Sequence, residues 1–451
     1  MMKHYRNLRS RSKRVRKIDA VALITTYLVL LFVIPAADVF TALGAAGGPA
    51  TLFAFVLLLL YLWAWFDSRS TLDRNYQPIR ILGLVFMCIM VASWISANRN
   101  NLPTLQRNAA DRALIFTFGW LGSMVLAADV IQTMDELKTI IRRLVNGVSI
   151  VAAVGALQFF TGKNLADYIY LPGLHAMSPV TDEITRGSFV RPQSTASHPI
   201  EFGAVLIITL PLAIHQAIYA IPEKRRLRWL QVAIIGGTAP LTVSRSAILA
   251  LIVVGVVIIP VWPKARRRGA YGVITVFALG TWIGVPGLIG TFKGLFTGIG
   301  SDSSTESRTK ALASAGTLIM HHPWLGMGPS TLLPAIYFYV DDQYLTSLIE
   351  TGILGAAALA AVFIVAWMVA RNARRLSMDP EIRHLGQCFA ACSAAPAVSF
   401  ATYDAFSFPM DADLTFLIIG LIGAFWRLSK SPLMGDGALA ELVNFREDAL
   451  L

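Results

Sequence analysis

The stretch LTVSRSAILALIVVGVVIIPVWPKARRR, residues 241–268, holds the pattern that decides the fold class. In it, an apolar run over 246–262 is followed directly by a basic block over 264–268. A membrane helix needs about 20 predominantly apolar residues, and basic blocks beside such helices are typical of cytoplasmic loops. This stretch therefore predicts a membrane-spanning helix that ends on the cytoplasmic side.

The same pattern continues along the chain. Hydrophobic residues make up 55% and charged residues 15%, with a mean hydropathy of +0.60, whereas soluble domains are roughly 45–50% apolar and about 25% charged. The formal net charge is +12, and the basic residues gather in blocks at 3–17, 224–228, 264–268 and 371–375. Because these blocks alternate with apolar runs, they indicate membrane topology, and no nucleic-acid partner is expected.

Apolar runs predict one all-α membrane domain over 20–428 with twelve spans. Six spans begin near residues 20, 50, 79, 113, 144 and 200, and six more cover 229–243, 246–262, 271–290, 344–370, 385–401 and 406–426. The basic arm before the first span imitates a secretory signal, but we expect an uncleaved anchor because the apolar stretch is long and more spans follow.

An even number of spans and the basic blocks place both termini in the cytoplasm, as a basic arm (1–19) and a tail (429–451). Two segments, about 161–199 and 291–343, become large loops on the outer side, where loops of this length carry function. The exception to the charge pattern is the outer segment with Arg99, Arg107 and Arg112.

Known metal and nucleotide motifs are missing from the sequence. Cys388 and Cys392 lie four residues apart in an apolar run, which favours packing on one helix face over a disulfide or zinc site. No HExxH or CxxC pattern supports a metal, and no P-loop or dinucleotide fingerprint occurs. We therefore expect no metal and no cofactor.

Arginines on the predicted outer side are candidates for binding an anionic substrate. Arg191 opens RPQSTASHPIEFG (191–203), Arg245 lies in a turn between two spans, and Arg308 lies in the second outer loop. An arginine at the membrane surface is costly unless paired, and its planar fork suits diphosphate or carboxylate. Anchoring to lipid headgroups, or pairing with a structural carboxylate, is the alternative for each. Arg186 is a further candidate contact in the first outer loop.

The second outer loop closes with HHPWLGMGPSTLLPAIYFYVDDQYLTSLIETGILG, residues 321–355. Asp341 and Asp342 are adjacent, and repulsion between two carboxylates raises the pKa of one toward the range useful for a general base. A helix cap is the alternative for this pair. Glu350 enters the following span, where pairing with an arginine and a catalytic role both stay open. His198 precedes a proline, which favours a loop-to-helix corner over a metal ligand or base.

Three segments together resemble the O-antigen ligase and polysaccharide polymerase family of bacterial membrane glycosyltransferases. These are RPQSTASHPIEFG, the SRSAIL hairpin, and the run from ESRTKALASAG through HHPWLGMGPS to DDQYLTSLIETGILG. The last is the most specific, since family members place ETGxxG after a polar motif and YL. The resemblance covers about residues 150–370.

The resemblance implies a bacterial inner-membrane enzyme that moves a glycan from a polyprenyl diphosphate carrier to an acceptor sugar hydroxyl on a glycan or glycolipid. Arg191 and Arg245 would clamp the diphosphate, with Arg308 as a third contact, and Asp341 would be the base. The ligases carry a histidine in the polar motif where this chain has Asp341, Asp342 and Gln343, which favours a polymerase-like or otherwise divergent branch. The alternative is a transporter or flippase of lipid-linked sugars, although such proteins place ionisable groups near the bilayer midplane.

Overall fold

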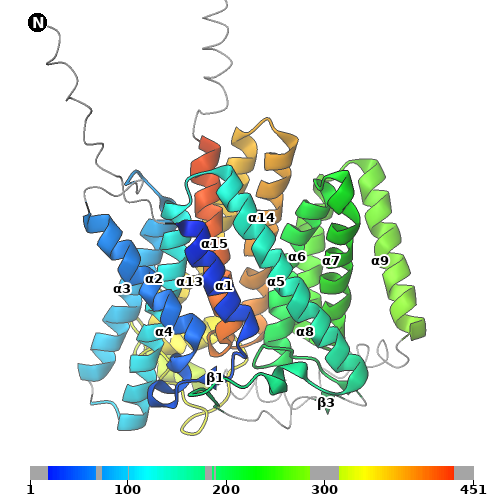
Figure 1. Cartoon of the computed structure of the whole chain (residues 1–451). Coiled ribbons are helices and arrows are strands. Elements are labelled where there is room, and N and C mark those ends of the chain that lie inside the picture. The colour runs from blue at the N-terminus through cyan, green and yellow to red at the C-terminus, as the bar shows by residue number, and fades with distance from the viewer. Residues whose placement is uncertain are drawn as a thin grey trace, which may run out of the picture.

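A computed structural model of the chain describes residues 19–67, 74–99, 101–177, 185–186, 189–284 and 314–430. In these residues the chain is a bundle of helices that run back and forth between two ends (Figure 1). The long helices are α1 (Ala20–Val33), α2 (Pro49–Phe66), α3 (Pro78–Arg99), α4 (Thr104–Val130), α5 (Met134–Thr161), α6 (Pro199–Ile218), α7 (Pro222–Leu241), α8 (Arg245–Ile258), α9 (Lys264–Gly284), α13 (Gly352–Leu376), α14 (Pro380–Ser399) and α15 (Pro409–Lys430).

Short elements occupy the connections, and all of them except η3 lie at one end of the bundle. The 3-10 helices are η1 (Thr41–Gly47), η2 (Leu165–Tyr168), η3 (Ile259–Val261), η4 (Phe400–Thr402) and η5 (Ala405–Ser407), and a short helix α12 (Gln343–Glu350) precedes α13. Strand β1 (Asp38–Val39) pairs antiparallel with β2 (His175–Ala176), and β3 (Thr185–Arg186) pairs with β4 (Phe189–Val190). The first pair fastens the predicted first outer loop to the connection between α1 and α2.

The all-α polytopic membrane class is confirmed. Eight helices in the described residues are long and apolar enough to cross a membrane, namely α2, α3, α4, α5, α6, α13, α14 with η4, and α15. Two apolar helices are shorter, α1 and the stretch 245–261. Each of the twelve predicted segments overlaps a helix of the bundle. The number of membrane crossings stays a prediction.

Several predicted boundaries were wrong. Helices α4 and α5 begin about ten residues before their apolar runs, because polar first turns extend them; Thr133, for example, accepts a 3.1 Å hydrogen bond from the Glu136 amide. The predicted span 344–370 is two helices, since the chain breaks between α12 and α13 at Gly352, where φ is +68°. A residue with positive φ cannot continue a right-handed helix.

The core lies where α4, α6, α14 and α15 meet, and α15 contacts α4 and α13 most extensively. Large side chains such as Phe202, Phe389 and Phe425 are fully buried there. Cys388 and Cys392 are also buried and free, in the packing position that the sequence predicts. The tight core fixes the helix ends, and thereby the connections that carry the polar residues.

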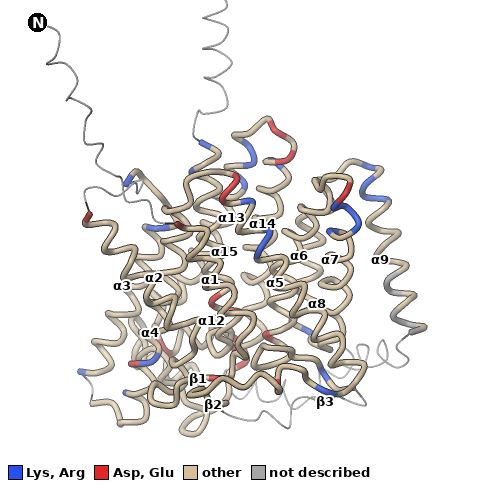
Figure 2. Tube along the Cα trace, viewed as in Figure 1, with Lys and Arg blue, Asp and Glu red and all other residues tan. Residues whose placement is uncertain are grey.

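The two ends of the bundle differ in charge (Figure 2). The basic blocks at 224–228 and 264–268 lie at the starts of α7 and α9, and the block at 371–375 lies at the end of α13. All three are at one end of the bundle, hereafter the basic end. The connections α1–α2, α5–α6, α7–α8 and α14–α15 lie at the opposite end with α12, hereafter the loop end. The predicted basic arm, the part of the second loop over 291–313 and the tail beyond Lys430 lie outside the described residues.

Candidate functional site

The segments 323–328 and 349–353 cross and hydrogen-bond to each other at the loop end. This crossing is hereafter the glycine clasp. The Met327 amide donates to the Ile349 carbonyl at 3.0 Å and the Gly328 amide donates to the Glu350 carbonyl at 2.8 Å. In return, the Ile353 amide donates to the Pro323 carbonyl at 2.9 Å. Both Gly326 and Gly352 have positive φ, and a Cβ on either would lie 2.2–2.3 Å from the backbone of the other segment. The sequence motif is thus a backbone crossing that sets the start of α13.

Asp342 is the N-cap of α12. One of its carboxylate oxygens accepts from the Tyr344 amide at 2.9 Å and the Leu345 amide at 3.1 Å. This is the cap role that the sequence left open for the pair. Asp341 beside it is exposed to solvent at the loop end. The cap fixes the direction in which α12 presents Gln343 and Glu350.

Glu350 holds the second loop with its carboxylate. Its two oxygens accept one hydrogen bond each, from the Ser330 amide at 2.9 Å and the Leu332 amide at 3.0 Å. Burial and then the nearby charge of Asp404 raise the pKa of Glu350 to about 8, although the two amide bonds act to lower it. A carboxyl group with this pKa is divided between its acid and base forms near neutral pH.

Arg191 and Arg245 are brought to one place. The buried Arg191 guanidinium donates through Nε to the Thr242 carbonyl at 2.9 Å, in the turn that leads to Arg245, the first residue of α8. Val243 in this turn has a φ of +47°, which is costly for a β-branched residue and is a type of strain found at functional sites. The structure therefore places the two arginines of the predicted clamp on neighbouring segments.

The turn between α7 and α8, which carries Arg245, is hereafter the arginine hairpin. The connection between α14 and α15 joins it to α12. At the start of this connection, the Thr402 hydroxyl donates at 2.8 Å to the hydroxyl of Ser246, the residue that follows Arg245. Further on, the Phe406 amide donates to Gln343 Oε1 at 2.7 Å, and Gln343 Nε2 donates to Ser347 Oγ at 3.1 Å. This connection thus holds two segments that are distant from it in sequence. The arginine hairpin is about 160 residues away from it, and α12 is about 60 residues away.

Asp404 lies in that connection, and sequence reasoning missed it. Its Oδ2 accepts a 2.5 Å hydrogen bond from Ser407. Burial and then the charge of Asp341 raise the pKa of Asp404 to about 6, against the effect of the Ser407 bond. Asp341, Asp404 and Glu350 therefore form a chain of electrostatically coupled carboxyl groups. A lone acidic residue in a short turn between two apolar runs was the signal that could have revealed it.

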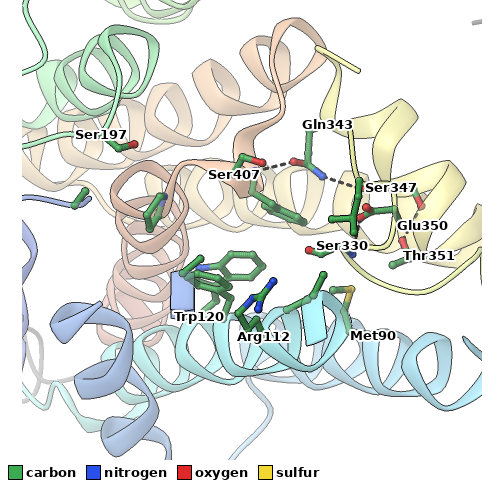
Figure 3. Close-up of a pocket in the computed structure, with 18 of the residues that line it drawn as sticks. Met90, Arg112, Trp120, Ser197, Ser330, Gln343, Ser347, Glu350, Thr351 and Ser407 are labelled. Atoms are coloured by element: carbon green, nitrogen blue, oxygen red, sulfur yellow. Dashed lines mark hydrogen bonds between the residues drawn. The ribbon is translucent and has the colours of Figure 1, made fainter. Parts of the chain in front are cut away.

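A cavity of about 360 Å³ opens beside these carboxyl groups. Glu350, Gln343 and Ser330 lie on one wall and Arg112 and Trp120 on the α4 wall opposite (Figure 3). Its other polar lining residues are Ser197, Ser347, Thr351 and Ser407, and its aromatic residues include Phe86, Phe116 and Phe406. The volume is within the range of about 300–1,000 Å³ that small-molecule sites occupy.

His198 has a structural place at the edge of the cavity. Its Nδ1 accepts from the Ile200 amide at 3.1 Å as the N-cap of α6, and its ring stacks on Phe408 at 5.4 Å. The buried Glu201 accepts 2.6 Å hydrogen bonds from the amides of Ser197 and Met410. These contacts tie the start of α6 to the start of α15 and favour the corner interpretation of the HP dipeptide.

Of the two other predicted substrate contacts, Arg186 and Arg308, the structure describes only Arg186. Arg186 stands in β3, opposite Phe189 in β4. Arg308 lies outside the described residues.

Three potential metal-ligating residues, His215, His384 and Cys388, have donor atoms within 4.8 Å of one another. Trp262 Nε1 donates to His384 Nε2 at 3.0 Å, so a neutral His384 carries its proton on Nδ1, which faces His215 Nδ1 at 3.1 Å. The protonated nitrogen has no lone pair for a metal. The three residues form a hydrogen-bonded chain between α6 and α14 near the basic end, away from the cavity.

Residues 230–360 match the sequence model of a protein family described as O-Antigen ligase. This segment is similar to the O-antigen ligase family. No curated protein matches the chain. The family predicted from the motifs is confirmed, and the O-antigen ligase segment runs from α7 through the arginine hairpin and the glycine clasp into α13.

Proposed function

We propose that the protein transfers a glycan from a polyprenyl diphosphate carrier to an acceptor sugar hydroxyl, at the outer face of the bacterial inner membrane. One observation carries the proposal. The arginine hairpin and α12, which carries Glu350, both belong to the O-antigen ligase segment but lie far apart in its sequence. The α14–α15 connection is hydrogen-bonded to both of them. A cavity of about 360 Å³ opens beside α12.

Arg191 and Arg245 are the proposed clamp on the donor diphosphate. As the bond from the sugar's anomeric carbon to the diphosphate oxygen breaks, the diphosphate takes the electron pair and gains negative charge. Fixed guanidinium groups stabilise that charge more in the transition state than in the substrate, which accelerates the reaction. Arg308 and Arg186 are proposed as additional contacts.

A carboxylate at the loop end is the proposed general base. It accepts the proton of the acceptor hydroxyl while the acceptor oxygen forms its bond to the anomeric carbon, so that no nucleotide or metal enters the step. Asp341 is the choice by sequence position, but Glu350 is favoured by geometry because it lines the cavity and has a pKa of about 8. Asp342 is engaged as a helix cap.

The test is glycan transfer by purified protein in liposomes that contain a polyprenyl diphosphate glycan, with an acceptor glycan added in the presence of EDTA. Wild type should elongate or glycosylate the acceptor. Arg245→Lys should lose transfer by about 10²-fold or more, because a point charge cannot replace a bidentate fork and removing one such electrostatic contact costs about this factor.

Arg107→Lys is the matched control, since Arg107 is an exposed arginine of α4 at the same end. It should transfer at the wild-type rate. Equal activity of Arg245→Lys and wild type would remove this arginine from the site. Movement of the donor glycan across the bilayer, with no transfer to the acceptor, would favour the flippase alternative over the enzyme.

A further inference from the structure

Arg112 projects from α4 into the cavity. It is partly buried, lies on the wall opposite Glu350 (Figure 3), and makes no hydrogen bond or ion pair within the described part of the chain. A cation at the edge of a membrane is costly unless something anionic compensates it. The compensating group is therefore expected from a ligand.

The neighbouring carboxylates are already engaged. Glu350 accepts two backbone amides through its two oxygens. Asp111, adjacent in sequence, accepts a 2.8 Å hydrogen bond from Trp94 Nε1. Neither is arranged as a counter-ion for Arg112.

The stem of Arg112 is held in place. Gly44 in η1 has a φ of +56°, and a Cβ there would lie 3.3 Å from Arg112 Cδ. The absence of a side chain at Gly44 lets η1 cover the aliphatic stem while the guanidinium remains at the cavity. This position also departs from the charge pattern of the molecule, because arginine is disfavoured on the outer side.

The remainder of the cavity suits a sugar ring. Trp120 is fixed by stacking on Phe416 with ring centroids 5.1 Å apart and by contact with Phe406 at 4.5 Å. A lining of aromatic residues with a few polar groups is typical of small-molecule sites. Arg112 adds a fixed positive charge to this aromatic and amide lining.

We propose that this cavity is the acceptor subsite and that Arg112 binds a carboxylate or phosphate monoester on the acceptor glycan. The inference rests on the proposed function, which assigns Arg191 and Arg245 to the donor. Those two arginines are not among the residues that line the cavity. Two separate cationic places at the loop end match a reaction of two substrates, with one substrate bound at each.

Equilibrium binding tests the proposal, with purified protein in nanodiscs of uncharged phosphatidylcholine. The probes are short oligosaccharides that end in glucuronic acid, in glucose 6-phosphate, or in glucose. Wild type should bind at least one acidic probe about 10- to 100-fold more tightly than the neutral one, the usual effect of a hydrogen bond to a charged group. The two acidic probes distinguish carboxylate from phosphate.

Arg112→Gln should lose this preference and keep the affinity for the neutral probe, which shows that the cavity is intact. Arg112→Lys should retain part of the preference, and Arg107→Gln should retain all of it. Equal binding of acidic and neutral probes by wild type, or an unchanged preference in Arg112→Gln, would overturn the proposal.

The transfer assay separates the two proposals. A rise in KM for the polyprenyl diphosphate donor alone in Arg112→Gln would assign this arginine to the diphosphate and overturn the acceptor subsite. A preference for acidic probes that depends on Arg112, in a protein that transfers no glycan, would support the subsite and contradict the proposed transferase activity.

Discussion

Glu350 combines a structural role with a position at the cavity. Its oxygens fix residues 330–332, and the same group faces the cavity. Only one lone pair on each oxygen is used by an amide, so the carboxylate can still accept a proton from a ligand. A base whose pKa lies near the working pH combines a useful ionised fraction with a useful basicity.

If Glu350 is the base, transfer should rise with pH and level off above about 8, because only the ionised carboxylate accepts a proton and its pKa is raised to about 8. Glu350→Gln should reduce the rate by about 10² to 10⁴, the usual contribution of general-base catalysis, and remove this rise. The measurement is the initial transfer rate between pH 5 and pH 9.

Asp404→Asn and Asp341→Asn provide the comparison for Glu350→Gln. Removal of the Asp404 charge should lower the pKa of Glu350 and move the rise to lower pH, since that charge raises it. A wild-type profile that levels off near pH 6, together with a fully active Glu350→Gln, would instead point to Asp404.

Sequence patterns identified most of these polar residues but could not rank them. The DDQY motif predicts both a base and a cap, and only the amide contacts of α12 assign the cap to Asp342. Asp404 was missed because its neighbours at the site, Asp341 and Glu350, are more than 50 residues away in sequence. Arg112 was noted only as an exception to the charge pattern, since a cavity is a property of several helices.

At the scale of elements, the glycine clasp explains why one predicted span is two helices. An apolar run continues from α12 into α13, so hydropathy alone predicts a single helix. The crossing needs a backbone at Gly352 with positive φ and no side chain, because Trp324 passes at 2.3 Å from the place of a Cβ. Hydrophobic periodicity does not report such a contact between segments.

Gly352→Ala should destabilise the protein by more than about 1 kcal/mol, since alanine both strains the positive φ and collides with backbone that cannot rotate away. Thermal unfolding in detergent should show a lower midpoint, and transfer should fall because Glu350 loses its position. Gly255→Ala in α8 is the control, as a Cβ there meets only Ile259 at 3.7 Å. An unchanged midpoint for Gly352→Ala would mean that the crossing is not required.

At the scale of the whole molecule, charge separates the two ends of the bundle. The three basic blocks of the described residues, at 224–228, 264–268 and 371–375, lie together at the basic end. The cavity, the coupled carboxyl groups and the arginine hairpin lie at the loop end. This division follows from the sequence, since alternating basic loops predict which connections share a side. The convergence of the functional segments does not, because it depends on which helices pack together.

The last prediction is that the loop end faces the outside of the cell and the basic end faces the cytoplasm. Tyr170 in the first loop is exposed at 77%, and Arg268 at the start of α9 is also exposed, so cysteines at these places are accessible to reagents. Cys88 is replaced by serine first because it is the exposed native thiol, whereas Cys388 and Cys392 are buried. In spheroplasts, an impermeant maleimide should label Tyr170→Cys and leave Arg268→Cys unlabelled, and both should react once the membrane is opened. Positive charge on the cytoplasmic side of the spans is the physical reason for this orientation. The reverse labelling pattern would show that the orientation is inverted and that the cavity lies on the cytoplasmic face. The proposed transfer at the outer surface could not take place there.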